Sequence, residues 1–151
     1  MTSLTLQQLI PVIQTAVGPV ILISGVGLLL LSMTNRFGRV VDRSRLLARE
    51  MPAAGRERED RSAQLAVLYR RAKIIRLAII LATASVLLAG LLIIFLFLAA
   101  LLQVEAALPA ALCFILCMAS LIASLVVFLL DLQVSLAALR MELAQAGFDG
   151  G

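Results

Sequence analysis

The chain has no histidine and only two cysteines among its 151 residues. Structural and catalytic metal sites are assembled from several His, Cys or carboxylate ligands, so two cysteines without histidine are too few to build one. Cys113 and Cys117 are four residues apart and share one helical face, where a disulfide bond between them would strain the helix. We interpret both as small apolar packing residues or as contacts between copies of the chain.

The groups required for acid–base or nucleophilic catalysis are also missing. The apolar stretches carry no paired carboxylates, the chain has no glycine-rich loop that would hold phosphates, and no serine has an evident base beside it. Such catalysis needs a titratable partner held close to the reacting atom. We therefore predict that the protein is not an enzyme and that it uses no cofactor and no metal.

Charged residues are absent from three long stretches, Leu4–Asn35, Leu77–Val104 and Ala106–Leu130. A helix that crosses a bilayer needs about 20 apolar residues, and each stretch is long enough. Hydrophobic residues make up 62% of the chain, which is typical of membrane proteins. The predicted fold class is all-α, an integral membrane protein of one domain, residues 1–151. Its three transmembrane helices cover about 12–33, about 77–102 and about 109–130.

Positive charge is concentrated between the first two spans. All but one of the thirteen basic residues lie between Arg36 and Arg76, together with five acidic residues. Lys and Arg remain on the cytoplasmic side of a membrane, so we expect the amino terminus outside and the carboxyl terminus in the cytoplasm. No basic residue precedes Arg36, which argues against a cleaved signal peptide. Because topology explains the basic cluster, we expect no nucleic-acid partner.

The segment between the first two spans has the pattern of a helical hairpin. Apolar or small residues recur at spacings of three and four on both sides of a Met51–Gly55 breaker, which is typical of amphipathic helices joined by a turn. The two arms, 34–50 and 57–73, are each about 25 Å long at 1.5 Å per residue. We predict a cytoplasmic antiparallel hairpin over 34–73 whose apolar stripes face each other and leave the arginines outward.

Leucines continue at helical spacing after the third span, at positions 132, 136, 139 and 143. This pattern predicts a cytoplasmic C-terminal helix over 131–146 that lies along the hairpin and stops at Gly147.

The densest motif begins where the first span leaves the bilayer. Its charged residues are Arg36, Arg39, Asp42, Arg43 and Arg45. One interpretation is a flank that contacts anionic lipid headgroups. A second is a ring of charge formed by several copies, which would select ions. A third is pairing of these arginines with Asp131 or Glu142, and pairing of Asp42 with Arg39 or Arg45 within the helix is also possible.

This motif also carries a family resemblance. The Asn35-Arg36 exit followed by the Asp42-Arg43-Ser44-Arg45 core resembles a bacterial family of three-span membrane proteins that is catalogued as a domain of unknown function. The resemblance covers most of the chain in layout. It implies a small protein of the bacterial inner membrane, and it implies no activity.

The first span carries small and polar residues that are candidates for lining a pathway: Gln14, Thr15, Gly18, Gly25 and Ser32. Small residues allow membrane helices to approach closely, which would explain them without a pathway. Alternatively, such residues between leucines form the wall of a gated pore.

The third span has a stripe of small and polar residues, Cys113, Cys117, Ser120, Ser124, Asp131 and Ser135. We expect these side chains to face the helix bundle, because lipid offers polar groups no partners. Asp131 lies at the cytoplasmic edge of the span, where an ionisable residue is a candidate functional acid.

Three spans alone enclose little space, so transport would require several copies around an axis. The leading hypothesis is a homo-oligomer that conducts ions, with the first helix lining the pathway and the arginines at its cytoplasmic mouth. The alternative is a non-conducting adaptor or assembly factor whose hairpin binds a partner protein or anionic lipid. A third hypothesis is an accessory subunit of a larger membrane enzyme.

Overall fold

The computed structural model describes residues 6–50, 55–105 and 107–145, and in these ranges the chain forms three helices and no strand. They are α1 (Leu6–Arg49), α2 (Arg56–Leu102) and α3 (Ala107–Gln145). Each is long and apolar enough to cross a membrane. The all-α fold class is confirmed, and the protein is a multi-pass membrane protein.

The first helix runs without interruption from the apolar stretch into the hairpin. It contains Pro11 and Pro19 in its interior, and the Thr15 hydroxyl donates a hydrogen bond to the Pro11 carbonyl at 2.8 Å. Pro19 has no N–H to donate to the Thr15 carbonyl, and membrane helices tolerate such a missing bond where other groups satisfy the carbonyl. The first arm of the hairpin is therefore continuous with the first apolar stretch, and α1 ends at Arg49.

Glu50 and Gly55 flank the connection between the two arms of the hairpin. Gly55 has a φ of 104°, a conformation that glycine adopts without steric cost, and α2 begins at the next residue. Arg61 on α2 reaches back across the turn, where its Nη1 donates to the Glu50 carbonyl at 2.8 Å and lies 3.7 Å from the Glu50 carboxylate. Residues 51–54 of the predicted breaker lie outside the described residues.

The turn between α2 and α3 begins at Gln103. Gln103 adopts a left-handed conformation with a φ of 54° and caps α2, and the Val104 N–H donates to the Ala99 carbonyl at 3.1 Å. This cap satisfies carbonyls that the end of a helix would otherwise leave unpaired. Helix α2 ends at Leu102, the residue at which the second span is expected to end.

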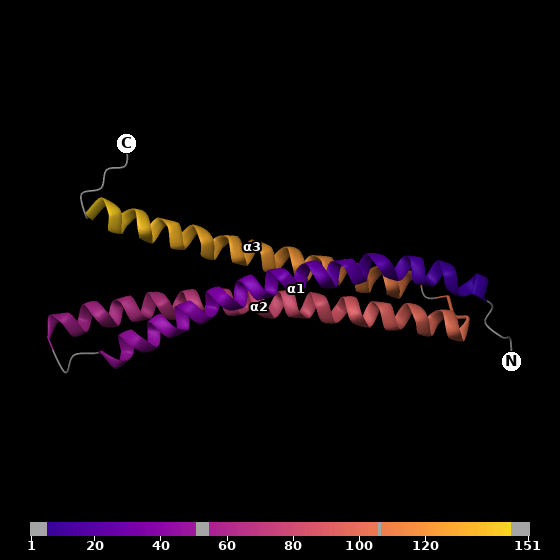
Figure 1. Cartoon of the computed structure of the whole chain (residues 1–151), viewed down its shortest axis with the longest axis horizontal. Coiled ribbons are helices and arrows are strands. Elements are labelled where there is room, and N and C mark those ends of the chain that lie inside the picture. Colours follow the sequence, from indigo (N-terminus) through magenta and orange to yellow (C-terminus); the bar gives the residue numbers. More distant parts are fainter. Residues whose placement is uncertain (1–5, 51–54, 106, 146–151) are drawn as a thin grey trace.

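Helix α2 lies against both other helices, and the three cross near the middle of the molecule (Figure 1). The core is at this crossing, where Val26 and Met33 of α1 pack against Ala78 and Ala82 of α2. Alanines allow the helix backbones to approach closely, which is how membrane helices gain packing energy.

The predicted course of the C-terminal helix is wrong. Beyond Asp131, α3 diverges from the α1–α2 hairpin as far as Gln145 (Figure 1). Small side chains of α3 bring it close to α2 within the spans, and the last contact described between the two helices is the one between Arg71 and Asp131. Residue 146 and the predicted stop at Gly147 lie outside the described residues.

Candidate functional site

A seam of hydrogen bonds joins α3 to α2. Thiol and hydroxyl groups of α3 donate to backbone carbonyls of α2, in the pairs Cys113–Leu88 at 3.7 Å, Cys117–Ser85 at 3.2 Å, Ser120–Leu81 at 2.8 Å and Ser124–Ala78 at 2.7 Å. The stripe predicted to face the bundle interior does so as far as Asp131, and the side chain of Ser135 lies outside the described part. These bonds satisfy polar groups that lipid would leave unpaired.

The seam ends in a buried ion pair at the end of the spans that adjoins the basic hairpin. The Asp131 carboxylate is fully buried, and its Oδ1 lies 3.5 Å from Nε of Arg71, whose side chain is 18% exposed. Arg71 Nε and both carboxylate oxygens of Asp131 have no hydrogen-bond partner among the described residues. A buried pair with unused hydrogen-bonding capacity is a weak source of stability and a candidate for a functional role.

The third interpretation, pairing of the first-helix arginines with Asp131, is wrong, because Arg71 of α2 takes that place. The side chain of Glu142, the other suggested partner, lies outside the described residues. The Arg36 guanidinium instead stacks on Phe128 of α3, 5.5 Å from the ring centroid, in a cation–π contact.

The other charged residues of the motif face outward. Arg39, Asp42, Arg43 and Arg45 are exposed, and Asp42 makes no ion pair with another described residue. Their position at the exit of α1 leaves them free to contact lipid headgroups or neighbouring copies.

The small and polar face of α1 is not used for packing within the chain. Gln14, Thr15, Gly18, Gly25 and Ser32 are all exposed. A Cβ atom added at either glycine would meet no atom within 4 Å. The core is instead formed by the neighbouring positions Ala16, Val26 and Met33. Close packing within one chain therefore does not explain these small residues, whereas packing between copies and a pathway wall both stay open.

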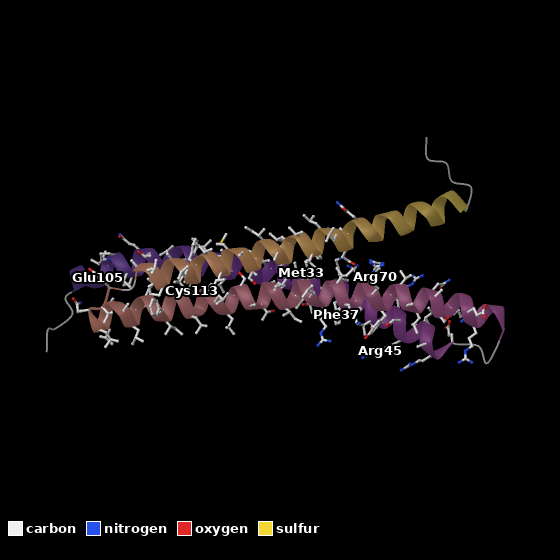
Figure 2. The ribbon with its side chains drawn as sticks, turned by 180° about the vertical axis from the view of Figure 1, so that it is seen from behind. Met33, Phe37, Arg45, Arg70, Glu105 and Cys113 are labelled. Atoms are coloured by element: carbon white, nitrogen blue, oxygen red, sulfur yellow. The ribbon has the colours of Figure 1, made fainter. Side chains whose placement is uncertain are left out.

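A groove of about 640 Å³ lies between the two arms of the hairpin. Its walls include Phe37 and Val41 of α1 and Leu65 and Tyr69 of α2, and three cations border it: Arg45, Lys73 and Arg76. The Lys73 ammonium lies 4.8 Å from the Tyr69 ring centroid. Figure 2 shows Phe37 and Arg45 on the side of α2 away from α3.

The sequence analysis missed this groove and the Arg71 partner of Asp131. The two apolar stripes do face each other, as predicted, but small residues on both arms (Ser44, Ala48, Ser62 and Ala66) leave space between them. That alternation of large and small residues on both arms is the sequence pattern from which the groove could have been predicted. The Arg71 contact depends on the axial register of α2 against α3. Three basic residues of α2 are close together in the sequence, and the sequence alone does not show which of them lies opposite Asp131.

Comparison with known proteins places the chain in a family. Residues 16–141 match the family described as Protein of unknown function (DUF2721). The comparisons with curated proteins and with solved structures found no match. Because the match covers most of the chain and all three helices, this protein belongs to the DUF2721 family.

Proposed function

We propose that the protein is a homo-oligomer of the bacterial inner membrane in which α1 of each copy turns its small, polar face toward a common axis, and that this axis is an ion pathway. The observation that carries the proposal is the uncovered face of α1. Its glycines have open space around them, and small residues in membrane helices serve close contact between helices or line pathways.

The arginines at the exit of α1 give the pathway its expected selectivity. In such an assembly Arg39 and Arg43, both exposed, would lie around the cytoplasmic mouth. A ring of arginines attracts anions and repels cations, and the exposed Asp42 moderates this field. The pathway is therefore expected to favour anions.

The test compares the native protein with Gly25→Leu and with a matched control, Gly90→Leu on α2. A Cβ at either glycine meets no atom within 4 Å, so both variants are expected to keep the fold of the single chain. Native mass in nanodiscs and ion flux in liposomes are measured for all three proteins. We expect the native protein and Gly90→Leu to form a ring and pass anions, and Gly25→Leu to lose both properties.

A monodisperse ring that conducts none of the common ions would contradict the pathway. A native protein that is monomeric, or that forms the same assembly with Gly25→Leu, would contradict the role of the α1 face.

A second candidate is a non-conducting adaptor whose hairpin is the binding element. The groove between the arms favours it, because apolar side chains such as Phe37 and Leu65 line a space that the chain itself does not fill. A monomer, or a dimer without an axial pathway, would support this function over conduction.

A further inference from the structure

The groove of the hairpin begins at the membrane surface. Arg76 at one end directly precedes Leu77, the first residue of a charge-free stretch. From Phe37 to Ala48 the groove follows α1 for about 17 Å at 1.5 Å per residue. The membrane end of the groove therefore lies at the level of the lipid headgroups.

The third helix does not cover this groove. Arg71 faces α3 through Asp131, and Tyr69 and Lys73 are each two residues away from it along α2. Because successive residues are about 100° apart around a helix, both side chains lie on the opposite side of α2 from Arg71. Phe37 and Arg45 also lie on the side away from α3 (Figure 2). An occupant must therefore come from outside the described chain.

The lining defines the chemistry of that occupant. The groove walls are mainly apolar, and Arg45, Lys73 and Arg76 have no carboxylate partner among the described residues. The volume of about 640 Å³ lies within the range of about 300–1,000 Å³ usual for small-molecule sites. An apolar chain with a single negative headgroup matches both the walls and the cations.

We propose that the groove binds a long-chain fatty acid drawn from the inner leaflet. Its carboxylate lies between Lys73 and Arg76 at the membrane surface, and its acyl chain runs along Val41, Leu65 and Tyr69. The cations form charge-assisted hydrogen bonds to the carboxylate, and the chain covers apolar surface that water would otherwise contact. The proposal rests on the hairpin as a binding element and is independent of conduction by α1.

Tyr69 provides a direct probe, because it is the only tyrosine of a chain without tryptophan and it lines the groove. Its emission is recorded in phosphatidylcholine liposomes, which add no aromatic side chain, while a fatty acid brominated at mid-chain is added, since bromine quenches a fluorophore only in contact. We expect saturable quenching. We expect the brominated methyl ester, which has no charge, to bind at least about tenfold more weakly.

Two pairs of variants separate the groove from general charge and from misfolding. Lys73→Gln/Arg76→Gln is expected to weaken binding about tenfold, whereas Arg39→Gln/Arg43→Gln, outside the groove, leaves it unchanged. Ala66→Leu fills the groove and is expected to abolish quenching. Gln64→Leu, an exposed position outside the lining, is the matched control and should bind normally.

Several results would overturn the proposal. These are absence of quenching, quenching that rises without saturation, equal quenching by phosphatidylcholine brominated in its chains, and equal weakening by both double variants. A Tyr69 emission that changes with protein concentration and not with fatty acid would show a second copy in the groove instead. None of these outcomes depends on the flux or the mass measured for Gly25→Leu, so the two proposals fail separately.

Discussion

At the scale of single residues, the buried contact between Arg71 and Asp131 carries a large desolvation cost. The Asp131 carboxylate is fully buried, and neither oxygen accepts a hydrogen bond from a described residue. Burying two charges costs several kcal/mol for each ion, and an ion pair recovers this only with good geometry and further hydrogen bonds. A separation of 3.5 Å without such bonds leaves the pair close to neutral for stability. We therefore expect the Arg71–Asp131 pair to orient the two helices or to serve a function.

A double-mutant cycle of Arg71→Met and Asp131→Leu measures this balance. Arg71→Met leaves a buried carboxylate without a counter-charge and is expected to cost about 3–5 kcal/mol. Asp131→Leu should cost less, because the partly exposed Arg71 can extend its guanidinium toward water. The double variant is expected to be more stable than Arg71→Met alone, as measured by reversible unfolding in mixed detergent. Additive losses would show that the two residues do not interact.

At the scale of elements, the seam between α2 and α3 explains how two long apolar helices find one register. Each small polar side chain of α3 meets a particular carbonyl of α2, from Cys113 near the start of α3 to Ser124. Hydrogen bonds between membrane helices are worth only about 0.6 kcal/mol each on average. The close approach that the small residues permit therefore contributes at least as much as the bonds.

Replacing Ser124 by leucine tests this seam. Ser124 is fully buried and its hydroxyl lies 2.7 Å from the Ala78 carbonyl, so Ser124→Leu removes a hydrogen bond and overpacks the contact. We expect a loss of about 2 kcal/mol or more. The adjacent Ala123 is exposed, and Ala123→Leu is expected to change unfolding by less than about 0.5 kcal/mol. Equal effects of the two variants would show that the helices do not pack through this face.

The same elements show which structural features can be predicted from the sequence. Charge-free stretches predict the helices because bilayer thickness requires them, and Gly55 predicts the turn because few other residues adopt its conformation. The interior face of α3 follows from the cost of polar groups in lipid. The partner of Asp131 and the groove do not follow, because both depend on how side chains of different helices meet. The divergence of α3 likewise depends on packing beyond Asp131.

At the scale of the whole molecule, the proposals share one requirement. Lipid must surround the apolar halves of the three helices, and the arginine-rich hairpin must lie in the cytoplasm. The concentration of basic residues between Arg36 and Arg76 supports this orientation. It places the groove at the inner leaflet and the arginines at the cytoplasmic mouth of the proposed pathway.

Cysteine accessibility tests that orientation most directly. With Cys113 and Cys117 replaced by serine, single cysteines are introduced at two exposed positions, as Gln64→Cys in the hairpin and Val104→Cys in the turn between α2 and α3. A membrane-impermeant maleimide is applied to intact cells and to inverted membrane vesicles. We predict that Val104→Cys reacts only in cells and Gln64→Cys only in inverted vesicles. Labelling of Gln64→Cys in intact cells, or of both positions from the same side, would contradict the account.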